Sequence, residues 1–123
     1  MIDHFGLVTA QFEPMLTFYK AALAPLGYEQ KAAYPGVAGL GNEEGPPDLW
    51  FTAGPSAVPL HLALRSPDRA SVDAFHAAAL AAGGRDNGGP GLRPHYGADY
   101  YAAFVFDPDG NNLELVCHTP EAP

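Results

Sequence analysis

The sequence predicts an α+β fold built from two βαβββ units, and three observations support this prediction. The two halves of the chain resemble each other. At the spacing that separates His4 from His61, Phe18 aligns with Phe75. The order of elements also occurs twice, with a strand-like run, a helix and then short strand-like runs in each half. Near the end of the chain, residues 107–110 read Asp-Pro-Asp-Gly, a strong turn signal between two strand-like runs.

The composition predicts one globular domain over residues 1–123, with units at approximately 1–54 and 60–118. Hydrophobic residues make up 47% of the chain and charged residues 16%, which is enough apolar mass for one core. The 14 acidic and 6 basic residues give a formal net charge of -8, which disfavours nucleic-acid and anionic-membrane partners. No apolar run approaches the roughly 20 residues that span a bilayer. The single cysteine, Cys117, excludes intrachain disulfides and is typical of the reducing cytoplasm.

In the first unit, a helix should follow the opening strand. It should begin near Glu13–Pro14, where proline is tolerated because an N–H in the first turn would have no partner and proline has none. Apolar residues then recur every three or four positions until Pro25–Gly27 end the helix. The strands expected in this unit are Ile2–Val8, Tyr28–Tyr34, Val37–Gly41 and Asp48–Ala53.

In the second unit, Ser66–Asp68 is typical of a helix start, with proline at the first helical position. An apolar stripe that includes Phe75 and Leu80 predicts a helix whose inner face is buried, and Gly83–Gly84 should end it. The strands expected in this unit are Leu60–Arg65, a weak run at 85–87, Tyr100–Asp107 and Asn112–Cys117.

Alternation along the strands places three side chains that can bind metal on the faces away from the helices. The leucines of 60–65 share one face, which should pack on the helices, so His61 lies on the other face. The same alternation places His4 and Glu114 on the helix-free faces of their strands. Each residue alone is typical of an ordinary core or surface position, but two imidazoles and one carboxylate together indicate a divalent-metal site. Open coordination positions on such an ion let a substrate oxygen bind.

These features together resemble the vicinal oxygen chelate superfamily, which includes glyoxalase I, bleomycin-resistance proteins, fosfomycin-resistance proteins and extradiol dioxygenases. The resemblance rests on the paired units, the matched histidines and the closing run DPDGNNLEL at 107–115, and it covers nearly the whole chain. It implies a cupped eight-stranded mixed sheet, with both helices on its convex side, that encloses a metal chelating a small substrate. It also implies that His4, His61 and Glu114 are the ligands of a divalent ion, with Fe, Mn, Zn and Ni not distinguished.

One departure from the superfamily pattern bears on the reaction. Glyoxalase I-like members take a fourth ligand, a carboxylate, from the last strand of the first unit, where this chain has Trp50. An indole N–H cannot bind a metal, so true glyoxalase I activity is not expected. Asp48 or Glu44 would replace the missing carboxylate only if the strand register shifted by two residues or more.

Other side chains near the expected metal are candidates for proton transfer or substrate contact. The candidate catalytic residues are Glu114, His95, Tyr96 and Tyr101. The candidate substrate-binding residues are Trp50, Arg93 and Tyr100. Imidazole and phenol groups beside a metal exchange protons with a substrate, although aromatic side chains also line pocket mouths without any chemical role. Cys117 shares the core face of its strand, which predicts packing rather than reactivity.

Two function classes follow from the sequence. One is a metal-dependent lyase, isomerase or dioxygenase acting on a small oxygenated molecule, and the other is a metal-free protein that sequesters a drug or metabolite. Three ligands favour the enzyme, because a pure binder does not need them. A homodimer is expected, since unpaired strand edges are usually covered by another chain. The resemblance implies that the cup is completed either within one chain or by exchange, in which His4 of one subunit joins His61 and Glu114 of the other.

Overall fold

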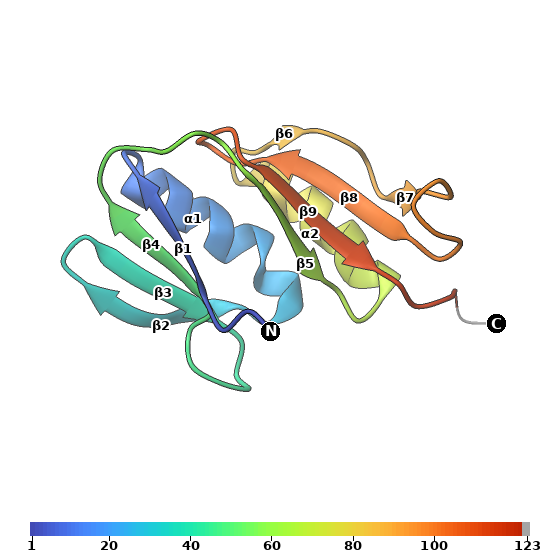
Figure 1. The fold of residues 1–123 in the computed structure, drawn as a ribbon, viewed down its shortest axis with the longest axis horizontal. Helices are drawn as coiled ribbons and strands as arrows, with labels where there is room; N and C mark the ends of the chain where they lie inside the picture. The colour runs from blue at the N-terminus through green and yellow to red at the C-terminus, as the bar shows by residue number, and fades with distance from the viewer. Residues whose placement is uncertain (122–123) are drawn as a thin grey trace.

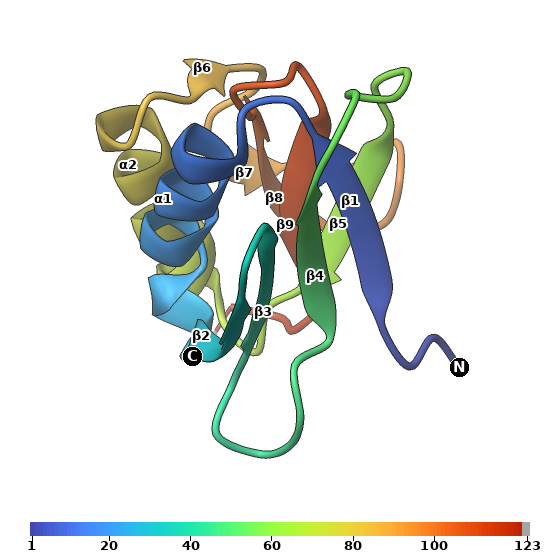
Figure 2. The same ribbon diagram turned by 90° about the vertical axis from the view of Figure 1, so that its left-hand side faces the viewer.

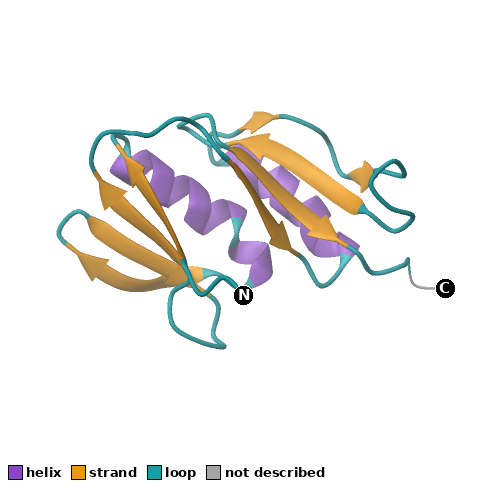
Figure 3. Cartoon of the chain, in the orientation of Figure 1, coloured by secondary structure: helices purple, strands orange, loops and turns teal. Residues whose placement is uncertain are grey.

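The computed structural model describes residues 1–121 and confirms the α+β class with its repeated unit (Figures 1 and 3). The first unit contains β1 (Phe5–Thr9), α1 (Phe12–Ala22), the 3-10 turn η1 (Ala24–Leu26), β2 (Glu29–Tyr34), β3 (Val37–Gly41) and β4 (Leu49–Ala53). The second unit contains β5 (His61–Arg65), α2 (Arg69–Ala81), β6 (Arg85–Asp86), β7 (Gly91–Leu92), β8 (Tyr101–Phe106) and β9 (Asn112–Cys117). The short strand β7 has no counterpart in the sequence prediction.

The strands are divided between two mixed sheets, one for each unit. The first has four strands in the order β1-β4-β3-β2, and the second has five, in the order β5-β9-β8-β6 with β7 also paired to β8. In each sheet the first strand of the unit pairs in parallel with the last, β1 with β4 and β5 with β9, and the other pairs are antiparallel. Consequently β1 and β5 each lie at the edge of a sheet.

Both helices lie on the same side of the two sheets, as the alternation of the strands predicts (Figure 2). The core between helices and sheets includes Phe18 and Phe75, which occupy matching positions in the two units and are fully buried. Cys117 is buried in the same cluster, as expected for a packing residue. Among the described residues, no helix is long and apolar enough to cross a membrane.

The second helix begins at Arg69, two residues after Pro67, which the sequence placed at the first helical position, and one residue of its predicted stripe is exposed. Asp68 caps α2 by accepting a hydrogen bond from the Ser71 backbone N–H at 2.7 Å. Phe75 is 0% exposed, whereas Leu80 is 38% exposed, so the expectation that Leu80 is buried is wrong. Leu80 follows Phe75 by five residues, which corresponds to about 140° around a helix and turns it out of the buried face.

A buried carboxylate joins the two units at the turn between β8 and β9. Asp107 is 3% exposed, and its Oδ2 accepts hydrogen bonds from the Tyr19 hydroxyl and the Asn111 side-chain amide, both at 2.7 Å. Its Oδ1 accepts the backbone N–H groups of Asp109 and Asn111. The Asn111 Oδ1 in turn accepts the Leu60 N–H at 3.0 Å, next to the start of β5. Burial beside Asp107 raises the pKa of Tyr19 well above its usual value.

We expect the substitution Asp107→Asn to lower the free energy of unfolding by about 2 kcal/mol. Both carboxylate oxygens of Asp107 accept hydrogen bonds, whereas the amide nitrogen of asparagine cannot accept any. Chemical denaturation monitored by circular dichroism measures this change. The exposed strand residue Glu29 provides the control, since Glu29→Gln removes a carboxylate with no such contacts. Equal stability of the two variants would contradict the role assigned to Asp107.

Candidate functional site

The candidate site lies on the helix-free face of the second sheet, where His61 and Glu114 meet. His61 is the first residue of β5, and Glu114 lies on the neighbouring parallel strand β9, opposite Ala63. The Nε2 atom of His61 and the Oε1 atom of Glu114 are 3.0 Å apart. The Glu114 side chain is only 3% exposed, whereas that of His61 is 51% exposed. The site therefore combines a buried carboxylate with an accessible imidazole.

The loop between β7 and β8 covers the buried carboxylate with Tyr100. The Tyr100 hydroxyl donates a hydrogen bond to Oε2 of Glu114. Burial, together with this hydrogen bond, raises the pKa of Tyr100 to about 12, so the phenol stays protonated at neutral pH. Phe104, on the neighbouring strand β8, stacks against the imidazole of His61, with ring centroids 6.4 Å apart.

Further aromatic rings extend from Tyr100 along the same loop. Ring centroids are 4.1 Å apart for His95 and Tyr96, and 5.3 Å apart for Tyr96 and Tyr100. The rings of Tyr100 and the exposed His118 meet edge to face, with centroids 5.3 Å apart. Imidazole and phenol groups thus form a continuous row that begins at Glu114. Sequence reasoning named His95, Tyr96 and Tyr100 for this region but missed His118 and Phe104.

Two other candidate residues are engaged elsewhere. The Tyr101 hydroxyl donates to Oδ1 of Asp73 on α2 at 2.6 Å, which directs this side chain to the helix-covered face and away from Glu114. The Arg93 guanidinium donates to the carbonyl oxygens of Gly91 at 2.9 Å and Gly89 at 2.8 Å. Arg93 also lies over the ring of Phe104, 5.4 Å from its centroid. Its contacts therefore shape the loop.

Trp50 occupies the position in the first sheet that Glu114 occupies in the second. Glu114 pairs with Ala63, two residues after His61, and Trp50 pairs with Gly6, two residues after His4. The strand register is therefore the one assumed from the sequence, without the shift that would bring Asp48 or Glu44 to this position. Asp48 instead accepts a hydrogen bond from the Tyr28 hydroxyl at 2.8 Å.

His4 lies apart from the other two predicted ligands. It precedes β1 in the first unit, its side chain is 62% exposed, and its Nδ1 lies 2.7 Å from Oδ1 of Asp3. Within residues 1–121, no group of three or more His, Cys, Asp or Glu side chains is close enough to hold a metal ion. One chain therefore brings together two of the three predicted ligands, His61 and Glu114.

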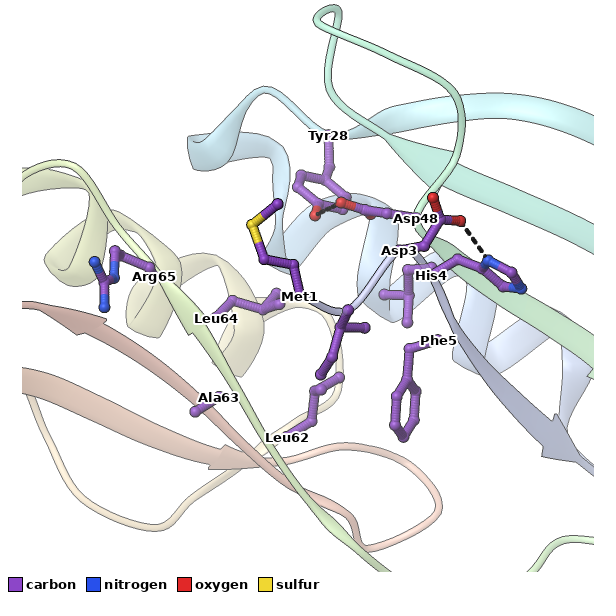
Figure 4. A pocket seen from close by; sticks show the side chains of 12 residues that line it. Met1, Asp3, His4, Phe5, Tyr28, Asp48, Leu62, Ala63, Leu64 and Arg65 are labelled. Carbon is purple, nitrogen blue, oxygen red and sulfur yellow. Dashed lines mark hydrogen bonds and ion pairs between the residues drawn. The ribbon is translucent and has the colours of Figure 1, made fainter.

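A cavity of about 660 Å³ separates His4 from the second sheet (Figure 4). It lies between the edges of β1 and β5 and is lined by residues 1–5 with Tyr28, Asp48 and Leu49 on one side and residues 62–65 on the other. Figure 4 shows His4 across this space from Leu64 and Arg65. The lining includes neither His61 nor Glu114, so this cavity is distinct from the His61–Glu114 pair. It is an opening between two unpaired strand edges.

The donors that are present fit a divalent first-row metal ion. Burying an ionised carboxylate is costly unless a cation or several hydrogen bonds compensate for lost water, and a metal ion beside Glu114 would do so. The 3.0 Å between Nε2 of His61 and Oε1 of Glu114 is also suitable. Two donors that bind one ion at about 2.1 Å and at a right angle lie about that far apart. One chain thus supplies two adjacent ligands of such a site.

Comparisons with known proteins agree with the fold described above. The family model described as the Glyoxalase/Bleomycin resistance protein/Dioxygenase superfamily matches residues 1–115. No curated protein matches the chain. A solved glyoxalase/bleomycin resistance protein from Albidiferax ferrireducens T118 is 27% identical, with a TM-score of 0.78 over 95% of this chain and 97% of that one.

Two further solved structures share the fold at lower identity. A glyoxalase/bleomycin resistance protein/dioxygenase family enzyme from Burkholderia phytofirmans PsJN is 20% identical, with a TM-score of 0.74 over 96% of this chain and 98% of that one. A lactoylglutathione lyase from Agrobacterium tumefaciens is 17% identical, with a TM-score of 0.69 over 95% of this chain and 92% of that one. These likenesses extend over nearly the full length of each chain.

Proposed function

Because the chain belongs to the glyoxalase/bleomycin resistance protein/dioxygenase superfamily, we propose that it is a divalent-metal-dependent enzyme acting on a small oxygenated molecule. The observation that carries this proposal is the buried carboxylate of Glu114 held 3.0 Å from the imidazole of His61 on the helix-free face of the second sheet. Imidazole and carboxylate groups are donors that divalent first-row metals bind in proteins.

The residues around this pair have distinct roles in the proposal. His61 and Glu114 hold the metal, and His4 completes the set. When bound, the metal supplies a Lewis acid that polarises a substrate oxygen. His95 and Tyr96 carry imidazole and phenol groups along the row that begins at Glu114, where they take up or deliver a proton. Substrate contacts come from Tyr100 and the neighbouring rings.

The reaction class that this arrangement favours is that of a lyase, isomerase or dioxygenase with three protein ligands. Trp50 stands where glyoxalase I-like members carry a carboxylate, and its indole offers the metal no donor. In the complete site the Trp50 ring serves as an apolar wall for substrate instead. Arg93 supports the opposite wall by tethering the loop that carries the aromatic row.

The second part of the proposal is a homodimer in which a second copy covers the free edges of β1 and β5. These edges carry unpaired backbone groups and face each other across the cavity of about 660 Å³. Exposed strand edges of this kind are normally covered by another chain. A second copy supplies the complementary edge, because the two units repeat the same topology. In this arrangement His4 of one subunit reaches the His61–Glu114 pair of the other.

We expect light scattering at micromolar concentration to give a molar mass twice the 13.0 kDa of one chain. A mass of one chain would remove the dimer and leave His4 apart from the other two ligands.

A metal-free binding protein is the second candidate function, and Trp50 is the observation that favours it. A large apolar ring in place of a carboxylate is typical of a pocket that binds its ligand by contact rather than by coordination. Metal analysis of protein purified without chelators or metal-affinity resin separates the two functions. Retention of about one divalent ion per chain supports the enzyme, and metal-free protein that binds small molecules with undiminished affinity supports the binder.

We also propose that the protein works in the cytoplasm. The free thiol of Cys117 is fully buried and has no disulfide partner in the sequence, which suits a reducing compartment.

A further inference from the structure

We infer that Tyr100 is a positioning residue that holds Oε2 of Glu114, so that this carboxylate binds the metal through Oε1 alone. The inference rests on the proposed metal site and adds to it a residue that controls how Glu114 binds. Each carboxylate oxygen has its own partner in the structure. Oε1 lies 3.0 Å from Nε2 of His61, and Oε2 accepts the hydrogen bond from the Tyr100 hydroxyl.

The position of Tyr100 is determined by the backbone of its own loop. The Arg93 N–H donates to the Tyr100 carbonyl oxygen at 2.7 Å, and the Tyr100 N–H donates to the Gly97 carbonyl oxygen at 3.3 Å. Between them, the N–H groups of Tyr96 and Gly97 donate to the Arg93 carbonyl oxygen at 2.9 and 3.3 Å. These bonds close residues 93–100 into a compact turn. The turn fixes the backbone of Tyr100, so that its hydroxyl reaches Glu114.

Arg93 fastens this turn to the preceding loop. Its guanidinium donates to the carbonyl oxygens of Gly89 and Gly91 and lies over the ring of Phe104. Phe104 on β8 pairs with Glu114 on β9. Through Arg93, the turn is therefore anchored to the strand that neighbours Glu114. The Tyr100 ring also packs edge to face against the rings of Tyr96 and His118.

This arrangement has a specific consequence for metal binding. His61 and Oε1 of Glu114 would exchange their direct contact for a shared metal ion, while the Tyr100 hydroxyl would keep its hydrogen bond to Oε2. The phenol therefore prevents Oε2 from becoming a second donor and holds Oε1 toward His61. Without the hydroxyl, the buried Oε2 atom loses its partner, and the carboxylate is free to rotate or to bind through both oxygens. Hydrogen-bond partners of ligands affect metal affinity by about 10–100-fold.

The test compares Tyr100→Phe with Tyr101→Phe in the full chain. Both changes remove a hydroxyl that donates to a carboxylate, but the Tyr101 hydroxyl donates to Asp73 on the opposite face of the sheet. Phenylalanine keeps the ring contacts of the partly exposed Tyr100, so this variant is expected to fold. Dissociation constants for Mn²⁺, measured by competition with a chromogenic chelator, should rise by about 10–100-fold for Tyr100→Phe and remain unchanged for Tyr101→Phe.

A spectroscopic measurement reports the binding mode directly. The visible absorption of bound Co²⁺ depends on the number and geometry of its ligands, so Tyr100→Phe should change this spectrum, and Tyr101→Phe should not. Melting temperatures of the metal-free variants show whether either change acts through stability instead. A loss of Mn²⁺ affinity that is equal in the two variants, or an unchanged Co²⁺ spectrum in Tyr100→Phe, would overturn the inference.

The proposed metal site can be judged separately from the role of Tyr100. If Glu114→Gln weakens Mn²⁺ binding while Tyr100→Phe behaves as the unsubstituted protein, Glu114 is a ligand and the positioning role of Tyr100 is wrong. If Glu114→Gln binds Mn²⁺ as tightly as the unsubstituted protein, the metal site itself is wrong, and the inference about Tyr100 is overturned with it.

Discussion

The substitution Glu114→Gln is expected to abolish retention of a divalent metal while leaving the fold intact. Glutamine is nearly the same size, and its amide oxygen still accepts the hydrogen bond from Tyr100 in this 2% exposed position. The side chain loses its negative charge, however, which is the property that compensates a divalent cation at a buried site. Metal content after gel filtration should fall to background. The circular dichroism spectrum should not change.

A neutralised carboxylate outside the site is the control for this experiment. Glu44 is exposed in the loop before β4, so Glu44→Gln makes the same chemical change without touching the His61–Glu114 pair. We expect its metal content to equal that of the unsubstituted protein. Equal metal retention by both variants would show that Glu114 is not a ligand.

Strand periodicity was sufficient to predict where the His61–Glu114 pair lies. Alternation along β5 and β9 separates these two side chains from the leucines that face the helices, and the observed register places them on neighbouring strands. The repeat also predicted that Trp50 is equivalent to Glu114, which the pairing of Trp50 with Gly6 confirms. Such predictions succeed because they depend only on the two-residue period of a strand.

Loop contacts were not predictable in the same way. The hydrogen bond from Tyr100 to Glu114 depends on how residues 93–100 close on their own backbone, and no sequence period encodes that closure. Tyr100 and Tyr101 are adjacent aromatic residues, yet one reaches Glu114 and the other reaches Asp73, because successive side chains point to opposite faces. Their separate roles therefore follow from the start of β8 at Tyr101.

The sequence pattern also does not predict how the two units pack against each other. Gln11, in the first unit, donates through Nε2 to Oδ1 of Asp109 at 2.7 Å, and the Ser56 hydroxyl donates to Oδ2 of the same residue at 3.3 Å. These bonds, with the packing of α1 on α2, hold the units in an arrangement that leaves one edge of β1 and one edge of β5 unpaired. In this arrangement His4 stays apart from His61 and Glu114 of its own chain, which favours the proposed exchange between two chains.

Subunit mixing should therefore restore metal binding from two inactive variants. In a shared site, His4 of one chain joins His61 and Glu114 of the other, so neither His4→Ala nor Glu114→Ala retains metal as a homodimer. A heterodimer of these two variants contains one complete set of ligands, because the His4→Ala chain keeps Glu114 and the Glu114→Ala chain keeps His4. Heterodimers isolated with two different affinity tags, later removed, should hold about half the metal of the unsubstituted dimer.

The matched control combines His61→Ala with Glu114→Ala. These two ligands lie 3.0 Å apart in the same chain, so their heterodimer has no complete set in either arrangement and should hold no metal. Restoration in the first mixture and none in the second is possible only if His4 acts across the dimer. A site built within one chain gives no restoration in either mixture, and full metal retention by the His4→Ala homodimer would remove His4 from the ligand set.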